Sequence, residues 1–301
     1  MLTVASEFLP RIRRNEPMSR HTSWHVGGPA EVYFTPSDRR DLAAFLRSIP
    51  AEVPVCWVGL GSNLLVRDGG IAGVVISTQG ALDRLERSGA ETVYAEAGVA
   101  CARIARQCIK WGLGPAEFFA GIPGTMGGAL AMNAGAFGGE TWRHVVEVQT
   151  VDREGAEHRR DAREYRVSYR HVAPPAPQEW FLAGSLRFEL RAPEHQSEVQ
   201  EMLERRKATQ PIGEWSCGSV FTNPPGDYAA RLIETAGLKG LTIGGASVSS
   251  KHANFIINQG AATAADVESL IARVQEEVQR KHGVRLTPEV RIVGENAREG
   301  R

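Results

Sequence analysis

The sequence predicts an α+β protein of two or three packed subdomains. Its 301 residues exceed what one ordinary hydrophobic core holds together. Short β-branched runs alternate with helical patterns along the chain. The glycines gather in clusters, most densely within residues 112–139, which suits turns and close backbone contacts rather than long helices. We therefore expect three segments, residues 1–80, 81–207 and 208–301.

Most of the first 207 residues are predicted to alternate strands and helices. Strands are expected at residues 30–34, 53–58, 73–77, 92–96 and 181–190, and helices at residues 38–46, 102–111 and 194–207. Residues 146–151 and 156–160 are also strand-like, and the sequence Asp152-Arg153-Glu154-Gly155 between them is typical of a hairpin turn. This region is therefore expected to contain a sheet with at least one antiparallel pair.

The C-terminal segment contains the clearest helical pattern of the chain. Apolar residues recur at helical spacing in residues 264–281, namely at Val267, Leu270, Ile271, Val274 and Val278. Thr263 is placed to cap the start of this helix and Gly283 to end it. A shorter helix is expected at residues 228–236, with Gly237 in the stopping position.

Composition and charge exclude several classes of protein. Hydrophobic residues make up 42% and charged residues 23%, and 35 Lys and Arg balance 35 Asp and Glu, so neither a nucleic-acid partner nor a charged tail is expected. Glu7 and Pro10 interrupt the N-terminal apolar stretch, and no run of about 18 apolar residues follows, so we expect no signal peptide and no membrane span. The four cysteines lack C-x-x-C spacing. We expect them to be reduced, with no metal site, in a cytoplasmic protein.

One glycine loop directly follows the strand expected at residues 53–58. It reads Gly59-Leu60-Gly61-Ser62-Asn63-Leu64. Its two glycines allow backbone N–H groups to approach an anion, and the serine and asparagine add donors. Leu64 stands where the G-x-G-x-x-G dinucleotide signature has its third glycine, so this loop alone is more typical of a plain turn.

A second loop is richer in glycine, with seven between residues 121 and 139. So many glycines cost conformational entropy on folding, and a flat or phosphate-bearing ligand lying on the backbone would explain them. A short helix starting near Thr125 would point its N-terminus at a pyrophosphate. Residues 19–30 combine donors, an aromatic side chain and a Gly-Gly pair, which indicates either a surface loop or a contact with an adenine or isoalloxazine ring.

In this order, these loops and the motifs after them resemble the UDP-N-acetylenolpyruvoylglucosamine reductase (MurB) family, over residues 15–294. The motifs that carry the resemblance lie at residues 22–28 (TSWHVGG), 59–66 (GLGSNLLV), 121–129 (GIPGTMGGA), 132–140 (MNAGAFGGE), 165–168 (YRVS), 216–224 (SCGSVFTNP), 236–240 (AGLKG) and 286–291 (LTPEVR). The short spacing between the fifth and sixth motifs resembles the short form of the family, which lacks an inserted tyrosine-bearing segment.

The resemblance implies a two-lobed vanillyl-alcohol-oxidase-like (PCMH-type) FAD-binding module, followed by a smaller α+β substrate domain. It implies FAD as cofactor and NADPH as co-substrate, with reduction of UDP-N-acetylglucosamine enolpyruvate for peptidoglycan synthesis. The implied cofactor-binding residues are Trp24, Gly59, Gly61, Ser62, Asn63, Leu64, Gly121, Pro123, Gly124, Gly127, Gly128, Asn133, Ala134 and Gly135. The implied substrate-binding residues are Tyr165, Asn223 and Lys207. No partner other than the UDP-sugar and NADPH is expected, and the protein is expected to be a monomer.

Three residues are implied to be catalytic. Ser219 would donate a proton, and Glu289 would form a hydrogen bond to the enolic carboxylate that develops on the substrate. Arg166 would grip the substrate carboxylate with its guanidinium group. Arg170 competes for this role, and Arg166 is preferred because only it has a serine two positions on. Cys217 adjoins the serine motif, but no histidine base is fixed nearby in the sequence, which disfavours a catalytic thiol.

Three other classes of function remain open at this point. A different flavoenzyme on the same FAD module, such as an alcohol oxidase, would not need Ser219, Glu289 and Arg166 together. A doubly wound NAD-dependent dehydrogenase is disfavoured by the missing third glycine. A non-catalytic nucleotide-binding regulator is opposed only by the retention of all three candidate catalytic residues. A colourless purified protein would favour either of the last two.

Overall fold

The computed structural model describes residues 2–191 and 196–297 and divides the chain into two compact units. Unit 1 consists of Met1–Arg13, Tyr33–Leu60 and Val74–Arg205. Unit 2 consists of Arg14–Val32, Gly61–Gly73 and Arg206–Arg301. Each unit therefore joins segments that are distant in the sequence. The sequence predicted three consecutive segments instead, with boundaries near residues 80 and 208, and those boundaries stay a prediction.

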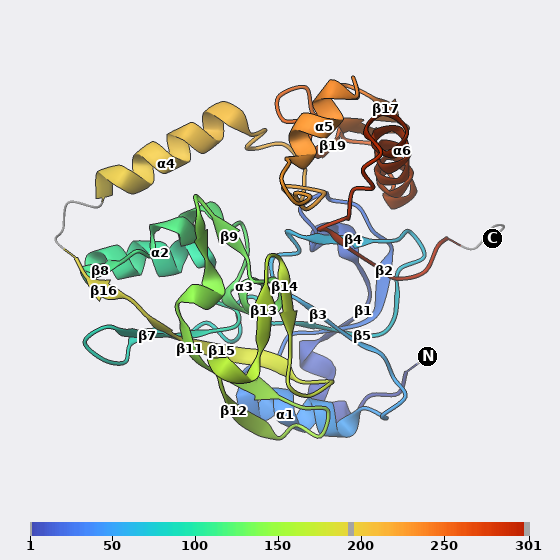
Figure 1. Cartoon of the computed structure of the whole chain (residues 1–301). Coiled ribbons are helices and arrows are strands. Elements are labelled where there is room, and N and C mark those ends of the chain that lie inside the picture. The colour runs from blue at the N-terminus through green and yellow to red at the C-terminus, as the bar shows by residue number, and fades with distance from the viewer. Residues whose placement is uncertain (1, 192–195, 298–301) are drawn as a thin grey trace. The chain divides into compact units, whose positions relative to one another are not determined.

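Unit 1 contains a five-stranded antiparallel sheet of order β12-β11-β15-β7-β6. Its strands are β6 (Leu85–Arg87), β7 (Thr92–Glu96), β11 (Val145–Val151), β12 (Glu157–Asp161) and β15 (Trp180–Arg187). The expected hairpin is confirmed, because β11 and β12 pair and the turn closes through Gly155 at φ 72°, whose N–H donates to the carbonyl of Asp152. Helix α3 (Met126–Met132) packs on β15, where a Cβ at Gly184 would lie 2.7 Å from the Met126 side chain (Figure 1).

Two longer helices of unit 1 form where the sequence predicts them. Helix α1 (Arg39–Ser48) begins at Asp38, whose carboxylate accepts the N–H of Asp41. Helix α2 (Cys101–Lys110) buries Cys101, Ile104 and Cys108 on one face in the unit 1 core. All four cysteines of the chain are free, as expected. The shorter elements here are η1 (Ser6–Arg11), η3 (Glu117–Gly121), η4 (Thr141–Arg143), η5 (Ala162–Glu164), β8 (Leu113–Gly114), β9 (Gly135–Ala136), β10 (Gly139–Glu140), β13 (Arg166–Ser168), β14 (His171–Ala173) and β16 (Glu189–Leu190).

Another sheet has four strands in the order β1-β2-β5-β3. Its strands are β1 (Ile12–Pro17), β2 (Pro29–Phe34), β5 (Ile71–Ser77) and β3 (Val55–Val58), of which β3 and β5 are parallel. The chain passes between the units at five points, of which three fall within β1, β2 and β5, one within helix α4 (Gln196–Thr209) and one in the loop between Leu60 and Gly61. Most of these passages therefore lie inside regular elements.

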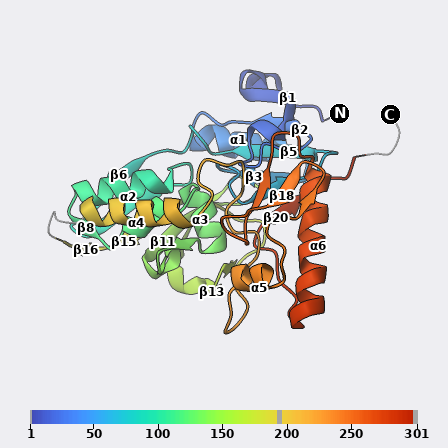
Figure 2. The ribbon, with the colours of Figure 1, turned by 90° about the horizontal axis from the view of Figure 1, so that it is seen from above.

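Unit 2 is organised around helix α6 (Ala264–His282). Thr263 caps its N-terminus in a capping box with Asp266, and Gly283 ends it at φ 70°, as predicted. The apolar face of α6 is buried in the unit 2 core, and Figure 2 shows the helix running alongside β18. The other elements are η2 (Met18–Arg20), α5 (Ala229–Thr235), the three-stranded sheet β17 (Thr242–Ile243), β18 (Ala246–Val248), β19 (Ile256–Asn258), and the parallel pair β4 (Leu64–Val66) and β20 (Arg291–Val293).

The α+β class is confirmed, and a few expectations about single elements need correction. The strand expected at residues 181–190 is interrupted at Phe188, whose ring is buried in the unit 1 core between β15 and β16. Helix α4 is described from Gln196, so its expected start at residue 194 lies outside the described residues. The hairpin of β13 and β14 was not predicted, because its strands are short and largely exposed.

Two structural absences hold within the described residues. None of the helices there combines the length and apolar character that crossing a membrane requires. The same residues contain no cluster of three or more His, Cys, Asp or Glu side chains arranged to hold a metal ion.

Candidate active site

Ser219 lies in an irregular loop of unit 2 and presents its hydroxyl group. The preceding Gly218 adopts φ 82°, and a Cβ there would meet no atom within 4 Å. Ser219 is half-buried, and its hydroxyl makes no hydrogen bond to any residue that the structure describes. The loop therefore holds a serine whose hydroxyl is available to a ligand.

Unit 2 also brings the Glu289 segment against this loop. The backbone N–H of Glu289 donates to the carbonyl of Val220 at 2.7 Å, and Phe221 forms an antiparallel bridge with Pro288. Glu289 is half-buried. The two predicted catalytic residues Ser219 and Glu289, 70 positions apart in the sequence, are thus held on paired segments.

Cys217 is unsuited to act as a nucleophile. Its side chain is 5% exposed. Burial raises the pKa of its thiol well above the usual value, and the negative charge of Glu289 raises it further. The thiol therefore stays protonated at neutral pH, which agrees with the expectation from the sequence.

The first glycine loop is tied to the Glu289 segment in unit 2. The Asn63 amide donates to the carbonyl of Glu289 at 3.1 Å, and its own carbonyl accepts the N–H of Arg291. Gly61 adopts φ 61°, and a Cβ there would lie 1.9 Å from the His21 carbonyl oxygen. Gly61 is therefore required by packing within the protein, whatever else the loop binds. Ser62 is half-buried and Leu64 is buried in β4.

Trp24 occupies the core rather than a surface. Its side chain is fully buried among the core residues of unit 2, and its indole N–H donates to the carbonyl of Ile256 at 2.7 Å. The carbonyl of Trp24 in turn accepts the side-chain amide of Asn258. The aromatic ring that the sequence suggested for a cofactor contact is therefore enclosed by protein.

Close internal contacts explain several glycines of the second loop. A Cβ at Gly121 would lie 2.5 Å from the Phe137 ring, and one at Gly139 would lie 2.4 Å from the Phe118 ring. At Gly135 a Cβ would lie 2.2 Å from a carbonyl oxygen. Gly128 differs, because a Cβ there would meet only the Thr125 hydroxyl, at 3.9 Å. Most of these glycines are therefore needed for the packing of the loop itself, and Gly128 leaves open space.

The helix expected near Thr125 forms as α3, but its first N–H groups are already occupied. The N–H of Met126 donates to the carbonyl of Val99 at 2.8 Å, and that of Gly127 to the carbonyl of Ala97 at 2.9 Å. These two donors cannot also bind a pyrophosphate. This corrects the expectation that the N-terminus of the helix points freely at an anion.

Thr125 is the residue of this loop that sequence reasoning missed. It is 2% exposed, and its hydroxyl is buried without a hydrogen-bond partner. A Cβ at Gly59 would lie 2.4 Å from that hydroxyl oxygen, so only glycine at position 59 leaves it room. A buried hydroxyl with no partner costs stability, so a bound ligand that supplies one fits this place. Nothing in the sequence marked the hydroxyl as lacking a partner.

Asn133 is committed to internal hydrogen bonds. It ends α3 in the left-handed conformation, its side chain accepts the N–H of Trp142 at 3.0 Å, and its amide donates to the carbonyl of Ser168 at 3.2 Å. Arg170 donates to the carbonyls of Asn133 and Gly135 at 3.3 and 3.0 Å. The two side chains join the second glycine loop to the β13–β14 hairpin within unit 1.

The same hairpin presents Arg166 differently from Arg170. Arg166 is exposed at the start of β13, and its guanidinium has no hydrogen-bond or ion-pair partner among residues 2–191 and 196–297. Arg170 is half-buried and engaged as described. Tyr165 is buried against Trp142, its hydroxyl lacks a partner, and burial raises its pKa. Of the two arginines, Arg166 is therefore the one available for a ligand.

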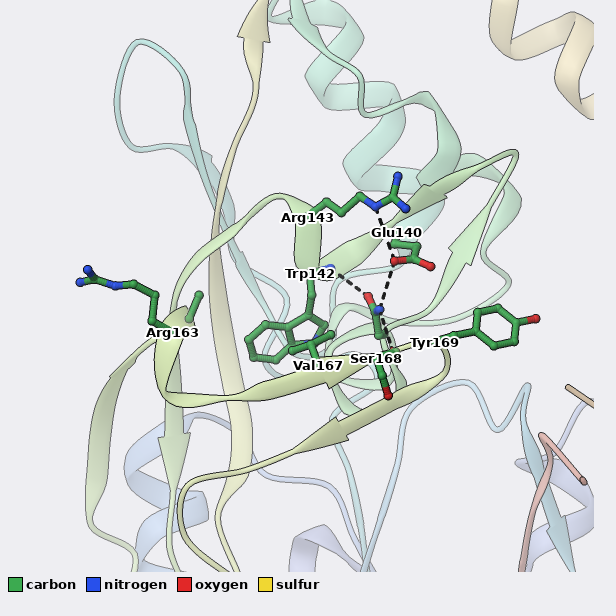
Figure 3. A pocket seen from close by; sticks show the side chains of 9 residues that line it. Glu140, Trp142, Arg143, Arg163, Val167, Ser168 and Tyr169 are labelled. Atoms are coloured by element: carbon green, nitrogen blue, oxygen red, sulfur yellow. Dashed lines mark hydrogen bonds and ion pairs between the residues drawn. The ribbon is translucent and has the colours of Figure 1, made fainter. Parts of the chain in front are cut away.

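A pocket of about 380 Å³ opens beside this hairpin in unit 1. Figure 3 shows Glu140 and Arg143 close together on one side of it, 3.5 Å apart, with Val167 and Ser168 on another. Its lining residues are Asn133, Glu140, Trp142, Arg143, Ala162, Arg163, Val167, Ser168 and Tyr169. The pocket does not include Arg166, and its two cations are both paired, Arg143 with Glu140 and Arg163 with Asp161.

The remaining substrate candidates lie in unit 2. Asn223 is exposed, and its side-chain oxygen accepts the N–H of Ala229 at the start of α5. Lys207 is exposed near the end of α4, and its carbonyl accepts the ammonium group of Lys251. Unit 2 thus contains Ser219, Glu289, Asn223 and Lys207, whereas Arg166 and Tyr165 belong to unit 1.

Comparison with known proteins relates both regions to one family. Residues 30–160 match the model of an FAD binding domain, and residues 210–293 match that of the UDP-N-acetylenolpyruvoylglucosamine reductase C-terminal domain. UDP-N-acetylenolpyruvoylglucosamine reductase of Alkalilimnicola ehrlichii is 62% identical over 285 residues, covering 94% of this chain and 95% of the relative. The protein of the same name from Methylococcus capsulatus is 56% identical over 284 residues, covering 93% and 92%.

A solved structure agrees with these sequence matches. The crystal structure of UDP-N-acetylenolpyruvylglucosamine reductase from Thermus caldophilus is similar with a TM-score of 0.82 at 34% identity. The similarity covers 94% of this chain and 98% of that one. Because the matches extend over nearly the whole length of both partners, the chain belongs to the UDP-N-acetylenolpyruvoylglucosamine reductase family.

Proposed function

We propose that this protein reduces UDP-N-acetylglucosamine enolpyruvate to UDP-N-acetylmuramate with NADPH, using bound FAD, in the synthesis of peptidoglycan precursors. The proposal rests on relatives that are named as this reductase and that match this chain over 92% or more of their own length. The observation that carries it in the structure is the pairing of the Ser219 loop with the Glu289 segment. We further propose that it acts as a monomer in the cytoplasm, and that it is of the short form.

The residues around Thr125 fit a bound FAD. The Thr125 hydroxyl is buried without a partner, the backbone at Gly59 makes room beside it, and Gly128 borders open space. We assign Thr125 and the backbone of residues 59, 124 and 128 to cofactor binding, together with Ser62. When bound, FAD supplies the hydride chemistry that side chains cannot perform.

The proposed catalytic roles follow from what each side chain can do. Hydride addition to the enol ether leaves negative charge next to the substrate carboxylate, and a proton must then reach that carbon. The unpartnered hydroxyl of Ser219 would give this proton, which it can do only to a strongly basic centre in a fixed geometry. Glu289 would form a hydrogen bond to the enolic carboxylate, and the free guanidinium of Arg166 would hold that carboxylate with two hydrogen bonds.

The roles of the remaining candidate residues follow from their exposure or burial. Asn223 and Lys207 are exposed in unit 2 and are assigned to the UDP portion. Tyr165 is buried, so we assign it to holding Arg166 in place from the neighbouring position. Trp24 and Asn133 are assigned to packing and to internal hydrogen bonds rather than to cofactor contacts.

An anaerobic single-turnover experiment tests the function directly. The flavin spectrum of the purified protein is recorded, NADPH is added, and UDP-N-acetylglucosamine enolpyruvate follows. Bleaching and then recovery of the oxidised spectrum is the expected result. Bleaching without recovery would keep the flavoenzyme and discard the substrate, and a protein that takes up no flavin when FAD is added would discard the whole proposal.

A further inference from the structure

A buried asparagine holds the loop that carries Ser219. Asn254 is 4% exposed, and its carbonyl accepts the N–H of Val220 at 2.9 Å. Its side-chain oxygen accepts the N–H of Phe221 at 3.0 Å, and its side-chain amide donates to the carbonyl of Phe221 at 2.8 Å. A single residue thus satisfies three backbone groups of Val220 and Phe221, the two residues directly after Ser219.

The other side of the loop is held by the segment that carries Glu289. The Val220 carbonyl accepts the N–H of Glu289 at 2.7 Å, and the N–H of Thr222 donates to the carbonyl of Thr287 at 3.0 Å. Before Ser219, Cys217 is buried in the unit 2 core, and Gly218 has open space around its Cβ position. The hydrogen bonds that hold the loop are those of the residues after Ser219, Val220 to Thr222.

We infer that Asn254 is a positioning residue, which acts by placing the Ser219 hydroxyl relative to the Glu289 segment. This inference rests on the proposed role of Ser219. The side chain of Asn254 is buried behind the loop, and its amide is committed to the Phe221 backbone, so its effect on the reaction passes through the loop. Neither a charge nor a nucleophile is involved.

The expected loss in rate follows from truncating the Asn254 side chain. Asn254→Ala leaves the N–H and the carbonyl of Phe221 buried without partners, and the loop then shifts toward water or other donors. A misplacement of about 1 Å in a reacting group costs on the order of 100-fold in rate. We therefore expect the step that consumes the substrate to slow about 100-fold.

The experiment separates the two half-reactions of the FAD-loaded protein by stopped-flow spectroscopy. In Asn254→Ala, flavin reduction by NADPH should stay within about twofold of wild type, while reoxidation by UDP-N-acetylglucosamine enolpyruvate slows as stated. The Kd of the substrate for the oxidised protein should be unchanged, which gives a loss in rate without a loss in affinity. Equal losses in both half-reactions, or a loss confined to affinity, would overturn the inference.

Matched variants separate positioning from a general loss of stability. Leu270→Ala removes a fully buried side chain from α6 in the same unit and should lower stability without changing the ratio of the two half-reaction rates. Asn254→Ser supplies a hydroxyl group that can form a hydrogen bond with the Phe221 backbone, and it should fold even where Asn254→Ala does not. A normal reoxidation rate in Asn254→Ser, with Asn254→Ala unfolded, would also count against the inference.

A double variant distinguishes failure of the inference from failure of the proposed function. If Asn254 acts through Ser219, the variant Ser219→Ala with Asn254→Ala should reoxidise no more slowly than Ser219→Ala alone. Losses that multiply would show that Asn254 acts elsewhere. If Ser219→Ala itself leaves reoxidation unchanged, the proposed role of Ser219 fails. If it slows reoxidation while Asn254→Ala does not, only the inference fails.

Discussion

Arg166 and Arg170 stand on the same hairpin, and substituting each by glutamine should give opposite results. The Arg170 guanidinium donates to the carbonyls of Asn133 and Gly135 at 3.3 and 3.0 Å and is half-buried. A hydrogen bond that involves a charged group contributes about 1.5–3 kcal/mol, and partial exposure reduces what these two contribute. Arg170→Gln should therefore lower the free energy of unfolding by about 2 kcal/mol. For a chain of 301 residues, that is a fall in Tm of about 3 °C.

Arg166→Gln should leave stability within about 0.5 kcal/mol of wild type, because its guanidinium has no partner among the described residues. It should instead slow reoxidation of the flavin by the substrate about 100-fold, as expected for a lost stabilising donor. Arg159→Gln, on the exposed face of β12, serves as the control and should change neither quantity appreciably.

Thermal unfolding followed by circular dichroism gives the stabilities, and stopped-flow absorbance gives the two half-reactions. Unfolding of Arg170→Gln at the wild-type temperature would refute its structural role. A loss of stability in Arg166→Gln with normal reoxidation would refute the role of Arg166, since the two arginines would then have exchanged roles.

Three further predictions concern stability and ionisation. In urea unfolding, Gly61→Ala should lower the free energy of unfolding by at least about 3 kcal/mol and Gly218→Ala by only about 1–2 kcal/mol. Both glycines have a left-handed backbone, but only the Cβ added at Gly61 would meet a backbone carbonyl, so equal losses would contradict this. The main-chain N–H at the N-cap of α6 lowers the pKa of Asp266 against the opposing effect of burial. Ionised Asp266 therefore contributes fully to the free energy of unfolding above about pH 4, and this contribution is lost as pH falls through the lowered pKa. Wild type should lose an increment of stability in that range that Asp266→Asn does not. The Arg231 side-chain hydrogen bond lowers the pKa of Asp227 to about 2, and NMR titration of Arg231→Gln should show that pKa rising toward about 4; no change would remove the arginine as the cause.

The parts of the fold that sequence reasoning found depend on neighbours in the sequence. Helix α6 was predicted because its apolar period, its Thr263 cap and its Gly283 stop all lie within 21 residues. The turn at Gly155 was found for the same reason. The β13–β14 hairpin was missed because exposed strands show no alternation of apolar and polar residues.

The candidate site divides in the same way. The motifs located the Ser219 and Glu289 segments but could not show that they pair, since pairing is a contact between distant residues. Glycines such as Gly121 and Gly139 indicated a ligand, yet the rings of Phe137 and Phe118, which the fold places against them, require their lack of a side chain. Thr125 and Asn254 were not predicted. The Thr125 hydroxyl lacks a hydrogen-bond partner and the Asn254 amide has one, and both facts depend on residues that only the fold brings next to them.

The parallel pair of β4 and β20 sets a condition on how this chain is made. Its two strands, Leu64–Val66 and Arg291–Val293, emerge from the ribosome about 10–45 s apart at ordinary rates of synthesis. Through that interval the apolar strand β4 lacks β20, its only strand partner among the described residues. Closure of unit 2 is therefore a late event in biosynthesis.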